Sequence, residues 1–186
     1  MKLVVGLGNP GEQYTNTRHN IGFWLVKSLS RSHDFSGPKA QCKGRLWSGI
    51  VGDVSVKSLL PGTYMNGSGE SVQSALQFYR LTHTDLIVVY DDFELPFGTV
   101  RIREKGTAGT HNGMRSIIQC IGTTNFVRMR IGVGPIPEGR LPADFVLSRF
   151  SCEEQSIRST KKSQWVKRMG LLIHDRVQQA QAPTDD

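Results

Sequence analysis

The sequence has 186 residues, a length typical of one domain whose core needs neither disulfides nor metal ions. Its 23 Lys and Arg against 16 Asp and Glu give a formal net charge of +7, which favours a polyanionic partner without establishing one. The cysteines at positions 42, 120 and 152 are scattered, and no apolar run is long enough to cross a bilayer, so we exclude a disulfide scaffold, a zinc knuckle and a membrane span and expect a cytoplasmic protein.

The first predicted strand, residues 2–7, runs into a polar stretch at residues 6–20 that reads GLGNPGEQYTNTRHN. Open α/β sheets usually place their ligands at the carboxyl ends of buried strands. His19 lies in this stretch, and histidine is the side chain best suited to proton transfer near neutral pH. We therefore predict the reactive centre here, and an ordinary polar loop is the alternative that these residues leave open.

A dinucleotide-binding turn is a further alternative, because Gly6, Gly8 and Gly11 have the spacing G-x-G-x-x-G after a strand. Pro10 lies inside the motif and removes one backbone N–H donor. The residues that follow are polar and show no helical period, so no helix begins where a pyrophosphate would need its N-terminus. We expect this motif to bind no dinucleotide.

The period of the apolar residues predicts the elements that come next, since helices repeat their buried face every three to four residues and half-buried strands every second residue. We expect a helix, a loop, a strand hairpin and a second helix. The first helix is predicted at residues 21–30, the loop at residues 31–44, and the hairpin strands at residues 45–51 and 54–60. The second helix is predicted to begin after Ser68 as its N-cap, and its buried face carries Val72, Ala75, Leu76 and Tyr79.

Polar side chains also stand beside the later predicted elements. Asn66 comes just before the second helix, where its amide can face a ligand, although a turn or capping role is the simpler local explanation. The apolar strand at residues 86–90 runs into Asp91 and Asp92. Adjacent side chains on a strand point to opposite faces, so at most one of these aspartates is expected to address His19, and spacing does not decide which one.

Two later strands, residues 99–105 and 126–133, carry stripes of basic side chains. Alternation places the apolar residues of each strand on one face and the cations on the other. Such a face can meet phosphate groups, although a solvated polar face explains each stripe almost as well. The cations are Arg101, Arg103 and Lys105 on the first strand and Arg128 and Arg130 on the second.

A glycine-rich loop at residues 106–113 leads into a helix that lies between these two strands in the sequence. A helix N-terminus behind such a loop can hold an anion or an oxygen that becomes negative, and His111 and Asn112 are expected at its mouth. The rest of the chain is predicted as a proline-rich excursion at residues 135–142, a closing helix after a Ser151–Glu154 capping box, and a flexible tail at residues 178–186.

Three dense blocks within residues 1–150 follow the order of one known family. The first is GLGNPG with Tyr14 and the run Thr17-Arg18-His19-Asn20, the second covers residues 61–69, and the third ends in His111-Asn112-Gly113. In these blocks the sequence resembles the bacterial-type peptidyl-tRNA hydrolases, which cut the ester between a peptide and the ribose of tRNA. The resemblance implies a single α/β domain over residues 1–186, with a mixed, largely parallel twisted sheet flanked by helices.

The resemblance also implies roles for individual residues. Asp91 is the functional member of its doublet in the family, and we assign it to orient the imidazole of His19, the expected general base for water. Asn9 is implied to distinguish peptidyl-tRNA from free aminoacyl-tRNA. Further implied contacts to substrate or tRNA are Tyr14, Tyr64, Asn66, His111 and Asn112 near the junction of tRNA and peptide, and Arg103 and Arg130 on phosphate.

The sequence departs from the family pattern at three places. Lys105 and Thr110 stand where glycine is usual, so the lip of the glycine-rich loop is expected to be narrower or stiffer. The segment at residues 135–142 is shorter than in many members and lacks their His-Pro-Gly, which reduces the expected contact to RNA or the expected lid.

Two rivals to this hydrolase remain. A metal hydrolase would draw its ligands from His19, His111, Asp91 and Asp92, but neither H-E-x-x-H nor two histidines at helical spacing occur. A relative that binds RNA without hydrolysis is the rival from another class. We expect a metal-independent peptidyl-tRNA hydrolase without cofactor, membrane or obligate protein partner, acting as a monomer, and without a serine nucleophile because no G-x-S-x-G elbow is present.

Overall fold

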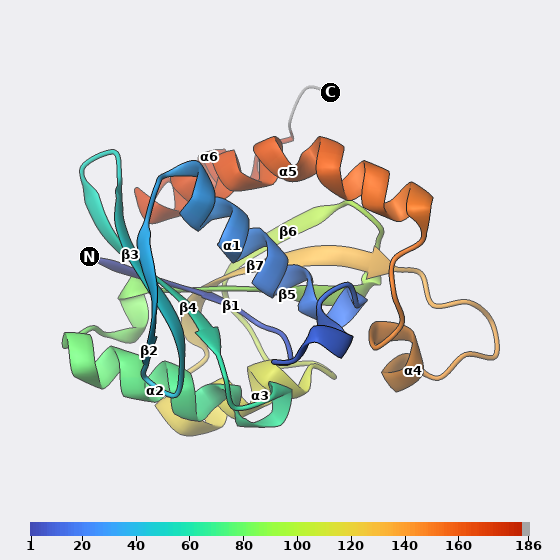
Figure 1. Cartoon of the computed structure of the whole chain (residues 1–186), viewed down its shortest axis with the longest axis horizontal. Coiled ribbons are helices and arrows are strands. Elements are labelled where there is room, and N and C mark those ends of the chain that lie inside the picture. The colour runs from blue at the N-terminus through green and yellow to red at the C-terminus, as the bar shows by residue number, and fades with distance from the viewer. Residues whose placement is uncertain (184–186) are drawn as a thin grey trace.

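The computed structural model describes residues 1–183 and contains one seven-stranded sheet with helices on both faces (Figure 1). Its strands are β1 (Lys2–Gly6), β2 (Ser36–Gln41), β3 (Gly44–Val51), β4 (Val54–Pro61), β5 (Leu86–Pro96), β6 (Val100–Lys105) and β7 (Asn125–Gly134). They lie in the order β2-β3-β4-β1-β5-β7-β6. The central strands β4, β1, β5 and β7 are parallel, whereas β2/β3, β3/β4 and β6/β7 pair antiparallel. The predicted mixed α/β architecture is confirmed.

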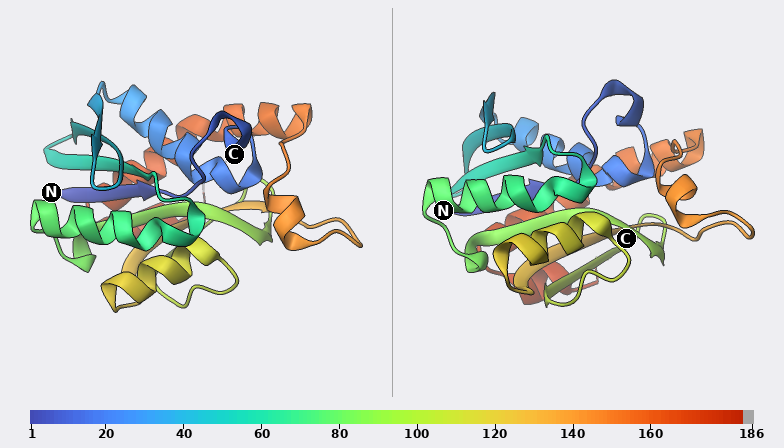
Figure 2. Two further views of the ribbon diagram at one scale, coloured as in Figure 1. Left: turned by 60° about the horizontal axis from the view of Figure 1, so that its bottom comes forward. Right: turned by 90° about the horizontal axis from the view of Figure 1, so that it is seen from below.

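Two layers of helices cover this sheet (Figure 2). The helices are α1 (Ile21–Ser32), α2 (Ser68–Tyr79), α3 (Asn112–Ile121), α4 (Pro142–Val146), α5 (Cys152–Ile173) and α6 (Val177–Gln181), with short 3-10 turns η1 (Glu12–Tyr14), η2 (Arg18–Asn20), η3 (Met65–Gly67) and η4 (His83–Asp85). One apolar core lies under α1 and α5, and a second lies under α2 and α3. On β1, Val4 belongs to the first core and Leu3 and Val5 to the second, which explains why this strand is apolar on both faces.

Helix α1 packs closely on β1 and β5 because Gly22 has no side chain. A Cβ at Gly22 would lie 2.3 Å from the carbonyl oxygen of Val89 and 2.7 Å from the backbone nitrogen and oxygen of Leu7. The backbone N–H of Phe23 also donates to the carbonyl of Leu7 at 3.1 Å. The turn η2, which precedes α1 and carries His19, is thereby held close to β5.

The path of the chain after β1 argues against a dinucleotide site. Behind the glycine motif the chain forms η1 and η2, and α1 begins only at Ile21. No α-helix therefore opens at Gly11, where a pyrophosphate would require one. The prediction that this motif departs from the dinucleotide-binding turn agrees with the structure.

Three local predictions were wrong. Residues 36–41 form β2 rather than part of a loop, and they escaped notice because this edge strand is almost entirely exposed. Ser68 is not the N-cap of α2, which is Gly67; the Ser68 hydroxyl instead donates to the carbonyl of Met65 at 2.8 Å. The expected tail from residue 178 begins inside α6, where Ala180 is fully buried. Its last residues, 184–186, lie outside the described part of the chain.

None of the helices within residues 1–183 combines the length and the apolar character that a membrane span requires. The predicted hairpin β3–β4, the start of α1 at Ile21 and the Ser151–Glu154 capping box of α5 are all present. The predicted closing helix is therefore capped as the sequence indicates, with the Ser151 hydroxyl accepting from the backbone N–H of Glu154.

Candidate active site

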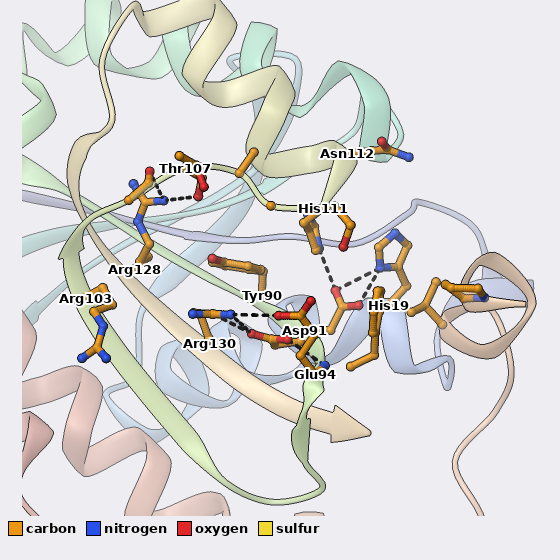
Figure 3. Close-up of a pocket in the computed structure, with 18 of the residues that line it drawn as sticks. His19, Tyr90, Asp91, Glu94, Arg103, Thr107, His111, Asn112, Arg128 and Arg130 are labelled. Atoms are coloured by element: carbon orange, nitrogen blue, oxygen red, sulfur yellow. Dashed lines mark hydrogen bonds and ion pairs between the residues drawn. The ribbon is translucent and has the colours of Figure 1, made fainter. Parts of the chain in front are cut away.

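A pocket of about 570 Å³ opens beside the second half of β5 (Figure 3). Its walls come from β5, β6 and β7, from the glycine-rich loop before α3, from η2 and from the start of α4. Sequence-predicted residues that line it are His19, Asp91, Arg103, His111, Asn112 and Arg130. The fold thus brings together in one cavity side chains that lie more than 70 residues apart, such as His19 and Asp91.

Asp91 lies between two histidines at the centre of this pocket. Its two carboxylate oxygens each lie 2.9 Å from Nδ1 of His19, and Oδ1 lies 2.9 Å from Nε2 of His111. Nδ1 of His111 accepts from the backbone N–H of Met114 at 3.3 Å, so the proton of His111 is on Nε2 and points at the carboxylate. Asp91 likewise accepts the Nδ1 proton of His19. Nε2 of His19 is left with a lone pair and with no hydrogen-bond partner among residues 1–183.

Burial and charge set the protonation of this pair. The side chains of His19 and Asp91 are only 13% and 1% exposed. Burial of the imidazole opposes its charged form, but the charge and the hydrogen bond of Asp91 outweigh this and raise the pKa of His19. Burial likewise opposes ionisation of Asp91, yet its interactions with His19 and His111 keep the pKa of this carboxyl far below its usual range. Asp91 is therefore a permanent carboxylate near neutral pH, and His19 is a strengthened base.

Asp92 turns away from His19, as alternation along a strand requires. Its Oδ2 accepts from Nε of Arg130 at 2.5 Å, and its Oδ1 accepts from the backbone N–H of Glu94 at 2.9 Å. Asp91 is therefore the aspartate that faces His19. Asp92 instead shapes the bend of β5 and neutralises Arg130.

The side-chain amide of Asn9 is held through its oxygen, and its nitrogen is free. Its Oδ1 accepts from the backbone N–H of Met65 at 2.8 Å, which fixes the orientation of the amide. The side chain of Asn20 accepts from the N–H of Asn9 at 2.8 Å and donates to its carbonyl at 2.9 Å. Nδ2 of Asn9 has no partner within the described chain, so this side chain presents N–H donors. Asn20 is a positioning residue that the sequence analysis did not identify, although it belongs to the first block.

Both the sequence and the fold of the chain are similar to those of known proteins. The family model described as Peptidyl-tRNA hydrolase matches residues 3–185 of the chain. The chain belongs to the peptidyl-tRNA hydrolase family. A peptidyl-tRNA hydrolase of Chloroflexus aggregans is 48% identical over 158 residues, which cover 84% of each protein, and one of Bacillus cytotoxicus is 45% identical over 154 residues, covering 83% of each. The crystal structure of peptidyl-tRNA hydrolase from Acinetobacter baumannii is 34% identical, with a TM-score of 0.90 over 97% of this chain and 92% of that one.

Both positions that depart from the pattern of the peptidyl-tRNA hydrolase family lie on the pocket wall. Lys105 and Thr110 are exposed there, and neither side chain makes a hydrogen bond or ion pair within residues 1–183. These two side chains therefore do not brace the glycine-rich loop. The short segment after β7 still reaches the pocket, because Pro142 and Ala143 at the start of α4 belong to its wall.

Arg128 is 2% exposed, so the prediction of an outward-facing basic residue at this position was wrong. Its Nη1 donates to the carbonyls of Gly106 at 2.7 Å and Thr107 at 3.0 Å, and its Nη2 donates to the carbonyl of Thr124 at 2.7 Å. Arg128 therefore holds the glycine-rich loop that carries His111.

Arg103 and Arg130, expected on phosphate, differ in how free they are (Figure 3). Arg103 is exposed on β6, and within residues 1–183 its guanidinium contacts only the carbonyl of Ile102 at 3.4 Å. Arg130 is paired with Asp92 at 2.5 Å and lies 3.9 Å from Glu94. A phosphate would meet an unopposed cation at Arg103 and a largely neutralised one at Arg130.

The remaining predicted contacts lie around the rim. The rings of Tyr14 and Tyr64 meet edge to face at a centroid distance of 6.5 Å, and Tyr64 is 56% exposed. Asn66 is exposed on η3, and Asn112 is exposed at the start of α3, where its Oδ1 accepts from Arg115 at 3.1 Å. Of these residues only Asn112 lines the pocket with His19.

His19, Asp91 and His111 also resemble a metal site, because one ligand atom from each lies within 4.8 Å of the others. The donor set does not fit a metal ion. A metal would need a lone pair on Nε2 of His111, and the proton would then have to move to Nδ1, which already accepts from Met114. The cluster therefore fits a hydrogen-bond network.

Arg18 anchors the turn that carries His19. Its Nη2 donates to both carboxylate oxygens of Glu154 at 2.8 and 2.6 Å, and its Nη1 donates to Ser148 Oγ at 2.6 Å and to the carbonyl of Arg149 at 2.7 Å. The guanidinium is buried. No sequence signal links these residues, since 136 positions separate Arg18 from Glu154.

Replacing Glu154 by glutamine is expected to lower the free energy of unfolding by about 2 kcal/mol, because a buried arginine loses its counter-charge. The magnitude lies below that of a fully buried pair because the Glu154 side chain is 21% exposed. Urea denaturation measures the effect. Glu153→Gln, a change in the same helical turn that touches no ion pair, is the matched control; equal losses in both variants would contradict the anchoring role.

Proposed function

We propose that this protein hydrolyses the ester between a peptide and the 3′-terminal ribose of tRNA, releasing free tRNA and peptide, with a water molecule that His19 activates. The observation that carries the proposal is the state of His19: Asp91 holds its Nδ1 at 2.9 Å, and its Nε2, on the wall of the pocket, has no hydrogen-bond partner among the described residues. Membership of the peptidyl-tRNA hydrolase family gives the substrate class.

The reaction requires no covalent enzyme intermediate. Nε2 of His19 takes a proton from water, and the oxygen of that water attacks the ester carbonyl. The carboxylate of Asp91 stabilises the imidazolium, as in a triad without its nucleophile. When the tetrahedral intermediate collapses, His19 returns the proton to the ribose oxygen that leaves. General-base assistance of this kind contributes about 10²- to 10⁴-fold in rate.

Amide donors are proposed to bind the acyl side of the substrate. The free Nδ2 of Asn9 suits a peptide carbonyl or the developing oxyanion, since its orientation is fixed in advance by Met65. We assign Asn66 and Asn112 to the peptide and the terminal ribose, and the exposed edges of Tyr14 and Tyr64 to packing against the substrate.

His111 receives a different role from the one expected. Both of its ring nitrogens are occupied, by Asp91 and by the backbone N–H of Met114. It is therefore proposed as a positioning residue that fixes the Asp91 carboxylate, rather than as a substrate contact.

The phosphate side of tRNA is assigned to Arg103, with Arg130 as a weaker second contact because Asp92 and Glu94 oppose its charge. The chain is proposed to act as a monomer. A cytoplasmic location fits the scattered free cysteines.

Arg103→Ala is expected to weaken tRNA binding and to reduce the slope of log Kd against log salt by about 1, because one phosphate contact is lost. Fluorescence titrations at several salt concentrations measure it. Arg101→Ala is the matched control, since Arg101 is exposed on the same strand but does not line the pocket. An unchanged slope for Arg103→Ala would place this residue on a merely solvated face.

The decisive test of the function uses purified protein with excess chelator. N-acetylated aminoacyl-tRNA is expected to be cleaved, and unblocked aminoacyl-tRNA is expected to survive. Loss of cleavage on chelation would point to the metal rival, and tRNA binding without cleavage of either substrate would point to a relative that only binds RNA.

A further inference from the structure

A second cavity is lined by Asn9 and shares no lining residue with the pocket that contains His19. It has a volume of about 390 Å³, and its walls run from Asn9 and Asn20 along the first half of α1 to the ends of β3 and β4. A neighbouring cavity of about 540 Å³ continues between α1, β2 and β3. Both cavities are lined by Lys27, Arg31 and Arg45, which we call the α1 basic cluster.

The secondary structure explains why these cations gather. Lys27 and Arg31 are four residues apart on α1, so their side chains lie on the same face of the helix. Arg45 lies on β3 and lines the same two cavities. The carboxylates that line these cavities are the exposed Asp34, in the larger one, and the exposed Glu12, in the smaller one.

The cluster is not neutralised by the protein. Within residues 1–183 no carboxylate forms an ion pair with Lys27, Arg31 or Arg45, and none of these side chains donates a hydrogen bond. Lys27 is half-buried and Arg31 and Arg45 are exposed, whereas Arg18 and Arg130 are each paired with a carboxylate, Glu154 and Asp92. Burial together with the charges of Arg45 and Arg31 lowers the pKa of Lys27, which shows that the cations act on one another. An anion in this cavity would relieve that repulsion.

The position of the cavity indicates which kind of anion binds there. Arg103 and Lys105, which have no carboxylate partner among the described residues, line the pocket that contains His19. The proposed function assigns this pocket to the tRNA end of the substrate. The α1 basic cluster lies instead on a cavity that starts at Asn9, the residue assigned to the acyl side. A volume of about 390 Å³ suits a few side chains rather than an RNA helix.

We propose that the α1 basic cluster receives carboxylate side chains of the peptide moiety, so that this enzyme prefers peptidyl-tRNA whose peptide carries Asp or Glu. The inference rests on the proposed function, because it requires the acyl group to leave the centre past Asn9. It adds a specificity determinant that acts on the peptide and is separate from the contacts to tRNA.

The test compares kcat/KM for one tRNA carrying three peptides, N-acetyl-Glu-Glu-Ala-Ala, its Gln-Gln isostere and its Lys-Lys counterpart. The acidic peptide is expected to be preferred over the isostere by about twofold to fivefold for each carboxylate that reaches the cluster. The triple variant Lys27→Gln, Arg31→Gln, Arg45→Gln is expected to lose this ratio. A triple variant with the same loss of charge at exposed positions, Lys39→Gln, Lys162→Gln, Lys167→Gln, is expected to keep it.

Other outcomes overturn the inference in distinguishable ways. Equal rates for the three peptides with the wild-type enzyme would refute the proposed preference for acidic peptides, while the proposed hydrolase function would still hold. Equal loss on all peptides in the cluster variant, with weaker binding of deacylated tRNA and a reduced salt slope, would assign the cluster to RNA phosphate. If no substrate is cleaved, the proposed function fails; fluorescence binding of the free acidic peptide, lost in the cluster variant only, would still support the site.

Discussion

Replacing His19 by alanine is expected to lower kcat for the hydrolysis of N-acetyl-aminoacyl-tRNA by about 10²- to 10⁴-fold, because the reaction loses its general base. Binding of tRNA is expected to stay nearly unchanged, since the proposed phosphate contacts, Arg103 and Arg130, lie on β6 and β7 and not on η2. Single-turnover kinetics with a tRNA titration separate the two quantities.

His33→Ala is the matched control for this substitution. His33 follows α1 and does not line the pocket; its Nδ1 lies 3.1 Å from the carbonyl of Leu29, and its ring packs near that of Phe35. It is expected to retain wild-type turnover. Wild-type turnover in His19→Ala would show that the base is misassigned, and a matching loss in both variants would indicate a general effect on the fold.

Replacing Asp91 by asparagine is expected to reduce kcat/KM by about 10²- to 10⁴-fold, a loss comparable to that of the equivalent change in a triad. With the amide oxygen at the position of Oδ1, which faces both imidazoles, the NH₂ group of asparagine takes the position of Oδ2 and faces the Nδ1–H of His19. Two donors then meet at His19, which disfavours the tautomer with its lone pair on Nε2 in the pocket, while His111 keeps its acceptor.

The pH dependence of kcat/KM is also expected to shift in Asp91→Asn. His19 acts as a base in its neutral form, so activity rises as pH rises through its pKa. The Asp91 carboxylate raises this pKa, and its removal therefore moves the acidic limb of the rate profile to lower pH while the plateau falls. Asp92→Asn, which changes a carboxylate that does not contact His19, is expected to keep the wild-type limb. An unmoved limb in Asp91→Asn would contradict the proposed pairing.

Local signals in the sequence were sufficient for much of the fold. The polar run before Ile21, the hairpin turn and the capping box at Ser151 are read from neighbouring residues, and all three are present. The edge strand β2 was missed because its residues SGPKAQ carry no apolar alternation. Such a strand forms only because β3 offers it a hydrogen-bonding edge.

The arrangement of the site depended on contacts that no local pattern encodes. Alternation predicted that Asp91 and Asp92 diverge, but only resemblance to the family selected Asp91 before the structure showed it against His19. Arg128 and Arg103 are equivalent in pattern and lie opposite each other on β7 and β6, yet the glycine-rich loop folds over one and leaves the other exposed. That difference arises from tertiary packing alone.

Glu154 performs two tasks with one carboxylate: it closes the first turn of α5 and it holds the guanidinium of Arg18. Fraying of that turn therefore releases the residue adjacent to His19, although the sheet beneath stays intact. With His19 in its proposed role, turnover is in this way coupled to the local stability of α5, and amide exchange at the start of α5 should report when the imidazole is out of place.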